Sequence, residues 1–138
     1  MKKLISYSIA LFFLTMLFSC KKNTLETVIT EPITGLTTIY QGTFTSAAHT
    51  TSGTVKLAKD AAGKKFLVFD SFQTDAGPDL RIYLSEDLKA NNYTEITNKV
   101  TNGTYQLDVA TTIDTDKKRK VLIWCKSFSV LFGSADLK

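Results

Sequence analysis

The sequence of 138 residues has the length of one domain, and 43% of its residues are hydrophobic, which is enough to bury a core. Its formal charge of +4 is too small for the basic surface that nucleic-acid binding requires, so we expect no nucleic-acid partner. Only one histidine and two cysteines are present, and most hydrolytic and metal-enzyme mechanisms therefore lack the side chains they need.

The N-terminus has the pattern of a signal peptide. Two lysines make a positive start, and an apolar run over residues 4–18 follows, shorter than the roughly 20 residues of a membrane-spanning helix. Ser19 and Cys20 complete a sequence that resembles the lipobox of bacterial lipoproteins. We therefore expect residues 1–19 to be a lipoprotein signal peptide and Cys20 to carry the lipid.

A lipidated cysteine anchors a protein without a spanning helix, because each buried methylene of its acyl chains contributes about 0.8 kcal/mol. Removing 19 residues from the 138 leaves 119, with 15 basic and 13 acidic residues. Residues 20–35 are rich in Thr, Lys and Glu and predict a flexible tether. We expect the protein in the cell envelope, and by resemblance to lipoprotein sorting rules Lys21 favours the outer membrane. The alternative is a plain secretory signal, with Cys20 incidental.

From residue 36 onward the pattern predicts strands, because Thr and aromatic residues are frequent and no long segment has a helical period. Residues 60–63 and 102–103 are predicted as hairpin turns, and the basic residues 117–120 fit a third, solvated one. We expect loops at 71–79 and 85–92, with one helical turn as an alternative for the second.

The predicted strands are short and regularly spaced, which is typical of a sandwich or barrel. The segment 121–125 is apolar on both faces and predicts a central strand. We therefore expect an all-β domain over residues 36–138, a small antiparallel β-sandwich or barrel-like domain. Its predicted strands are residues 37–46, 54–58, 65–69, 80–84, 94–100, 105–109, 121–125 and an alternating run from 127 to 132.

Cys125 is the first candidate functional residue. If Cys20 is lipidated, Cys125 has no partner for a disulfide within the chain. In a strand, Trp124 and Cys125 face opposite sides, and the cation of Lys126 favours the reactive thiolate form. The alternative is that Cys125 packs in the core as a small hydrophobic residue.

His49 is the second candidate, because it is the only histidine and lies in a polar segment. It can act as a ligand or a proton carrier, and together with Cys125 it would make half of a copper or zinc site. The alternative is an exposed loop histidine. Asp70, Asp75 and Asp79 offer calcium ligands in one segment, but their spacing favours turn residues, with Asp79 bonded to nearby backbone amides.

Three stretches together resemble the DM-thirteen family, whose domains are described as electron-transfer domains. The first includes residues 42–44, His49 and 53–55. The second includes 69–72 and the run from Gly77, Pro78 and Asp79 to residue 84. The third begins at residue 121, contains Trp124 and Cys125, and extends to 137. The resemblance spans about residues 40–137, nearly the whole expected domain.

The resemblance implies a β-sandwich-like fold and one characteristic cysteine, here Cys125. In animal relatives such domains accompany DOMON and cytochrome-b-type domains, and this company prompted the idea that the cysteine takes part in redox transfer. This sequence has no attached haem or DOMON partner, so an electron partner would be another envelope protein.

Three hypotheses follow, and each describes an accessory or binding domain rather than a stand-alone enzyme. The first is a redox accessory module in which Cys125 cycles through sulfenate, mixed disulfide or metal-bound thiolate, tuned by His49 and Lys126. The second is an envelope binding or adhesion module whose surface is formed by loops 71–79 and 85–92. The third is a copper or zinc carrier using His49 and Cys125. Apart from the lipid on Cys20, the sequence makes no cofactor evident.

Overall fold

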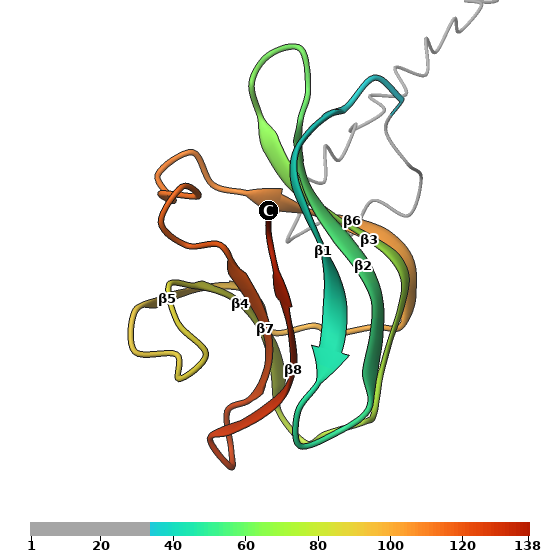
Figure 1. The fold of residues 1–138 in the computed structure, drawn as a ribbon, viewed down its shortest axis with the longest axis vertical. Coiled ribbons are helices and arrows are strands. Elements are labelled where there is room, and N and C mark those ends of the chain that lie inside the picture. Colours follow the sequence, from blue (N-terminus) through green and yellow to red (C-terminus); the bar gives the residue numbers. More distant parts are fainter. Residues whose placement is uncertain (1–33) are drawn as a thin grey trace, which may run out of the picture.

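A computed structural model describes residues 34–138 of the chain, and every regular element in this part is a β-strand. The prediction of an all-β domain is confirmed (Figure 1). No helix of the described residues is long and apolar enough to cross a membrane. The strands are β1 (Thr37–Ser46), β2 (Thr51–Lys59), β3 (Lys65–Thr74), β4 (Leu80–Ser85), β5 (Tyr93–Thr97), β6 (Gly103–Val109), β7 (Lys120–Cys125) and β8 (Val130–Asp136). The predicted signal peptide and Cys20 lie outside the described residues, as does most of the predicted tether.

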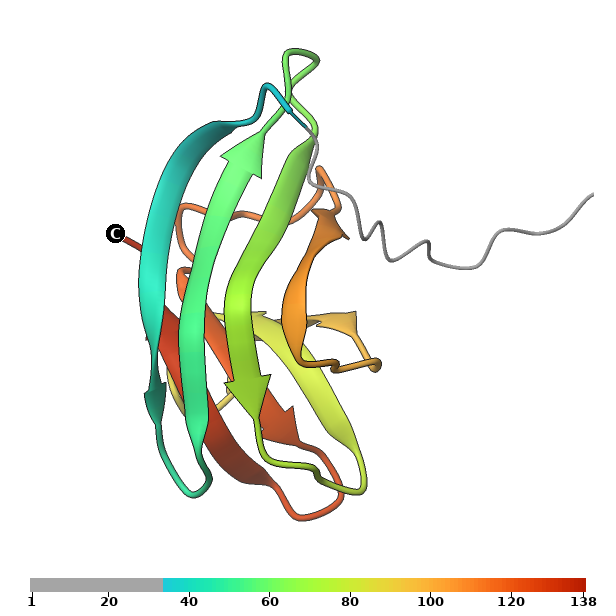
Figure 2. The ribbon, with the colours of Figure 1, turned by 90° about the vertical axis from the view of Figure 1, so that its right-hand side faces the viewer.

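The eight strands form one antiparallel sheet in the order β5-β4-β7-β8-β1-β2-β3-β6. The sheet curls until its two edge strands, β5 and β6, come back into contact, so the domain is nearly a barrel. Figure 2 shows β1, β2, β3 and β6 as one layer, with the remaining strands behind it. β7 lies between β4 and β8, as the apolar segment predicted for a central strand.

The core between the layers is built around aromatic rings. Phe69 stacks on Tyr105 at 4.7 Å between ring centroids, and Phe72 lies 4.9 Å from Phe44. These side chains come from β1, β3 and β6, so the aromatic cluster joins strands that are distant in the sequence. The core also includes Val55, Leu57, Leu67, Ile82, Leu84, Val121, Ile123, Cys125, Phe132 and Leu137.

β3 is longer than the sequence predicts. The loop expected at 71–79 is wrong for residues 71–74, which continue β3 to Thr74. The pairing register between β2 and β3 shifts between Ser52 and Thr54, and Ser71 has a φ of 50°. A bulge of this kind bends a strand and increases its twist. The irregular residues that suggested a loop therefore mark a bend in a continuing strand.

The predicted hairpin turn at Asn102 and Gly103 is wrong. β5 pairs with β4 and β6 pairs with β3, at opposite edges of the sheet. The side-chain amide of Asn102 accepts a hydrogen bond from the Thr74 N–H at 2.9 Å and donates one to the Thr74 carbonyl at 3.2 Å. Asn102 therefore attaches the start of β6 to the end of β3.

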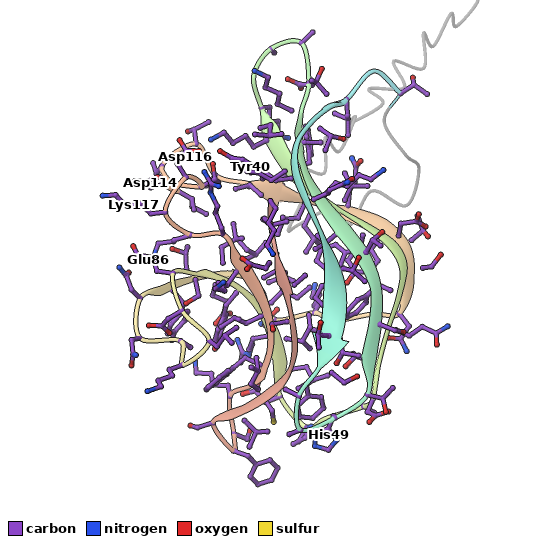
Figure 3. All side chains as sticks on the ribbon, in the orientation of Figure 1. Tyr40, His49, Glu86, Asp114, Asp116 and Lys117 are labelled. Atoms are coloured by element: carbon purple, nitrogen blue, oxygen red, sulfur yellow. The ribbon has the colours of Figure 1, made fainter. Side chains whose placement is uncertain are left out.

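The hairpin turn expected at the basic residues 117–120 is wrong as well. Residues 117–119 end a long loop between β6 and β7, which are not neighbours in the sheet, and Lys120 begins β7. Arg119 donates a hydrogen bond to the Tyr40 hydroxyl at 2.8 Å and lies over the Tyr40 ring. The same hydroxyl donates to Asp116 at 3.1 Å, and Figure 3 shows Tyr40 and Asp116 close to each other. The loop is thus fastened to β1.

The alternating run from 127 to 132 is a strand only in its second half. Residues 126–129 form the exposed turn between β7 and β8, and Ser129 has a φ of 53°. Phe128 is therefore 69% exposed at the turn rather than paired in the sheet. Alternation of apolar residues predicted the strand correctly only where neighbouring strands were available to pair with it.

Tyr105 carries a polar group that burial leaves without a partner. Its hydroxyl is fully buried and has no hydrogen-bond partner within residues 34–138. Such a group has a desolvation cost that a phenylalanine ring avoids. We expect Tyr105→Phe to raise the free energy of unfolding in urea by about 1 kcal/mol. The exposed Tyr93 serves as control, since Tyr93→Phe should change stability by less than about 0.5 kcal/mol. A loss of stability in Tyr105→Phe would contradict this account.

Alkaline pH should destabilise the fold through its buried tyrosines. Burial raises the pKa of Tyr83 to about 12 and also raises the pKa of Tyr105. Above the unfolded value of about 10, the unfolded chain loses these protons while the folded chain keeps them. The free energy of unfolding should therefore fall as the pH rises from about 10 to 12, by up to about 1.4 kcal/mol per unit for each such tyrosine. Urea unfolding measured at pH 8, 10 and 11 tests the sign.

Candidate functional site

Cys125 is the last residue of β7 and lies inside the domain. Its side chain is 0% exposed and belongs to the same core cluster as Ile123 and Phe132. It pairs with Leu80 on β4 and with Val130 on β8, both of which are half-buried. The thiol is free. In these surroundings it packs as a small hydrophobic group.

The chain neighbours of Cys125 lie outside this core. Trp124 faces the outer side of the sheet, as the alternation of a strand requires. There its ring lies 6.4 Å from that of Tyr83, on which Tyr93 stacks at 4.1 Å. Lys126 lies in the exposed turn after β7, and its N–H donates to the Asp79 carbonyl at 2.9 Å. The nearest cation in the sequence is thus separated from the buried thiol.

His49 lies in the loop between β1 and β2, at the end of the domain opposite Asp114 and Asp116 (Figure 3). Its ring stacks on Phe132 with 3.9 Å between centroids. Its Nδ1 is 3.6 Å from Oδ2 of Asp75, within reach of an ion pair when the imidazole is protonated. In the described part of the chain, no group of three or more His, Cys, Asp or Glu side chains is arranged to hold a metal ion.

Gly77, Pro78 and Asp79 lead into β4 and lie beside the end of β7, where Cys125 is located. A Cβ at Gly77 would lie 2.8 Å from Leu80 Cδ2 and 2.9 Å from Phe132 Cζ, so glycine permits this close packing. The Asp79 carboxylate accepts a hydrogen bond from Arg81 Nε at 2.6 Å. The prediction that Asp79 bonds to nearby backbone amides is wrong. Its carboxylate binds the guanidinium of Arg81 instead, because Arg81 lies two residues further along on the outer face of β4.

The three aspartates that suggested calcium have separate partners. Asp70 accepts hydrogen bonds from the hydroxyls of Ser71 and Thr104. Asp75 accepts the N–H of Thr50 at 3.0 Å, in addition to lying near His49. Asp79 is paired with Arg81. Their carboxylates therefore act in three local structures, as turn and strand-end residues do.

Two arrangements at this site were not predicted from the sequence. One is the ring of His49 lying over Phe132, which depends on how the turn after β1 folds back on β8. The other is the ion pair of Arg81 with both Asp79 and Glu95, at 2.6 and 2.8 Å. Alternation within β4 puts Arg81 and Tyr83 on one face, but a sequence pattern does not show which strand lies beside them.

Comparison with known proteins identifies the family of the chain. The model of the family described as Electron transfer DM13 matches residues 43–137. The chain belongs to this family. No curated protein matches the chain, and no solved structure matches it. The DM13 match includes β2 to β8, the loop of His49, the Gly77-Pro78-Asp79 segment and Cys125. The resemblance seen in the three sequence stretches is thereby confirmed.

The close packing at Gly77 of the DM13 domain is open to a direct test. Its backbone conformation does not require glycine, so Gly77→Ala isolates the effect of the added methyl group against Leu80 and Phe132. The added methyl group meets side-chain atoms that can shift, and alanine also lowers the entropy of the unfolded chain, so we expect a loss of about 1 kcal/mol in urea unfolding, at the low end of the cost of overpacking. The exposed neighbour supplies the control, because Ala76→Ser should leave stability nearly unchanged. Equal stabilities of the two variants would show that the packing is looser than the distances indicate.

Proposed function

We propose that this DM13 domain is an electron-transfer accessory module of a cell-envelope lipoprotein, held to the membrane by a lipid on Cys20. In this proposal the group that changes oxidation state is the thiol of Cys125. The observation that carries it is that Cys125 is the only cysteine of residues 34–138, which also contain no methionine, in a domain of an electron-transfer family. A thiol is the side chain that common oxidants convert reversibly.

The chemistry is a thiol–disulfide exchange with another envelope protein. The Cys125 thiolate attacks one sulfur of a disulfide in the partner, a mixed disulfide forms, and the partner's second sulfur leaves as a thiolate. The thiolate of a reduced thiol-containing envelope protein then attacks the partner's sulfur in the mixed disulfide, becomes disulfide-bonded to the partner and releases the Cys125 thiolate. The electron pair thereby passes from the incoming thiolate to the partner's second sulfur, and Cys125 ends unchanged. The domain supplies the thiol and the access to it, while the partner supplies the disulfide.

The burial of Cys125 makes local opening the controlling step. A partner cannot reach a thiol that is 0% exposed. The thiol is nevertheless one residue from the exposed turn 126–129. The hydrogen bond from Lys126 N–H to the Asp79 carbonyl holds the start of this turn against the residue that precedes β4. Breaking it and lifting the turn exposes Cys125 without unfolding the rest of the sheet, as local fluctuations at strand ends do.

Lys126 and His49 are the residues proposed to tune the thiol. When the turn opens, Lys126 is the cation next to Cys125 in the chain, and a nearby cation stabilises a thiolate. His49 covers Phe132, which shares the core cluster with Cys125. Its role in the proposal is to limit the access of water at this end of the domain.

Alkylation of Cys125, followed by mass spectrometry of its peptide from pH 6 to 9, tests the proposal. The native protein should react through local opening, faster than global unfolding would allow. Lys126→Pro removes both the charge and the N–H that bonds to Asp79. Because that hydrogen bond contributes about 1 kcal/mol, Lys126→Pro should react about fivefold faster than Lys126→Gln. Lys126→Gln is the matched control, because it removes the charge and keeps the N–H. Its reaction should instead slow at neutral pH, because the thiolate loses its cation.

The second candidate function is an envelope binding module in which Cys125 is a core residue. The observation that favours it is the complete burial of the thiol among apolar side chains. In this case Cys125 would react only at the rate of global unfolding, and Lys126→Pro would have no effect beyond its effect on stability. The same experiment therefore separates the two functions.

A further inference from the structure

The outer face of the sheet contains a polar hollow that the electron-transfer proposal does not use. It has a volume of about 640 Å³, within the range of small-molecule sites. Its floor is formed by residues of β1, β2 and β8, and Leu88 from the loop between β4 and β5 contributes to its wall. Figure 1 shows β8, which contributes to this floor, running beside β1 toward the C-terminus.

The strand register places one lysine on each side of Gln41. Gln41 of β1 is paired with Lys56 of β2. On its other side it exchanges two backbone hydrogen bonds with Lys138, at 3.0 and 2.9 Å. Neighbouring strands are about 4.8 Å apart, so the Cα atoms of Lys56 and Lys138 are separated by about 10 Å across Gln41. Both side chains are exposed, and both line the hollow.

Hydroxyl groups occupy the next positions along the same face. Thr43 is paired with Thr54, and Thr45 with Ser134, and all four residues line the hollow. A hydroxyl can donate a hydrogen bond, and an ammonium group has three donors. The floor therefore has two lysine ammonium groups next to four side-chain hydroxyls that can donate hydrogen bonds.

The side chains that line the hollow carry a net positive charge. Among the described residues that line it, three are lysines and one is an aspartate. Asp136 forms an ion pair with Lys120 at 2.9 Å, which leaves Lys56 and Lys138 as the cations that face the hollow without this counterion. Two lysines beside several hydroxyl donors suit a ligand with many acceptor oxygens and a negative charge.

We propose that this hollow binds a phosphate group, held by the ammonium groups of Lys56 and Lys138 and by hydroxyls of β1, β2 and β8. The phosphate belongs either to a lipid headgroup or to a soluble phosphate ester. The proposal does not depend on the redox chemistry of Cys125, which lies on the inner face of the sheet.

The test uses the full-length, isotope-labelled protein in neutral detergent micelles. Inorganic phosphate is added, and the amide shifts of Gln41, Thr43 and Ser134 are followed by NMR at constant ionic strength. In a second arm the micelles are doped with short-chain phosphatidylglycerol, with phosphatidylcholine as the comparison. We expect saturable shifts at these residues. Saturation by inorganic phosphate identifies a soluble ester as the source, and saturation only by phosphatidylglycerol identifies a headgroup.

Variants decide whether the two lysines are responsible. Lys56→Gln and Lys138→Gln should each weaken binding roughly tenfold, because each removes one charge-assisted contact. Lys99→Gln removes the same charge at an exposed position outside the hollow and should have no effect. Asp136→Asn frees Lys120 and removes the competing carboxylate, and should tighten binding several-fold. The proposal is overturned if neither probe gives saturable shifts, or if Lys99→Gln weakens binding as much as Lys56→Gln.

Discussion

The close approach of β8 to β1 and β2 is the constraint on which the rest of the domain depends. Here the two layers of the sheet join, and glycine lines the junction. A Cβ at Gly42 would lie 2.5 Å from the Asp136 carbonyl oxygen, and a Cβ at Gly133 would lie 2.4 Å from Cβ of Thr51. A side chain at either position would push the layers apart. Without this contact the curled sheet would open, and its aromatic core would be exposed to water.

Joining the layers at β1 gives each side of the sheet a different chemistry. On the inner side, Phe44 of β1 meets Phe69 and Phe72 of β3, so the same strand that closes the sheet also fills its centre. On the outer side, Gln41, Thr43 and other polar residues form the floor of the hollow. Because successive side chains of a strand point to opposite faces, β1 contributes to the aromatic core on one side and to the hollow on the other.

Much of this fold could be predicted from the sequence, because the alternation of apolar and polar residues that marks a strand lies within a single segment of the chain. The bounds of β1 and the central position of β7 follow from residues within each strand. The pairing of the edges does not: Asn102 and Gly103 have the composition of a hairpin turn, yet the amide of Asn102 is used to bind Thr74, far away in the chain. Ser71 similarly has the composition of a loop, but tertiary pairing with β6 holds it in a bulge of β3.

For the candidate site, the sequence could identify Cys125 and His49 as the chemically capable residues, but their surroundings depend on three-dimensional contacts. Burial of Cys125 depends on Leu80 and Val130 from two other strands. The position of His49 depends on Phe132, which also contacts the Gly77 segment. The hollow depends on a register that unites β7, β8, β1 and β2, and no single segment contains its pattern.

The physical separation of the two proposed sites has a consequence for how the domain works. In the proposed redox chemistry Cys125 reacts only when the end of β7 opens, whereas the hollow lies on the outer face of the closed fold, over strands near the centre of the sheet. A ligand in the hollow binds the closed and the locally opened states alike, because the turn at 126–129 contributes no residue to the hollow. Such a ligand has no differential affinity for the two states and cannot change the opening equilibrium. In the two proposals together, ligand binding in the hollow and exposure of the Cys125 thiol are therefore independent events.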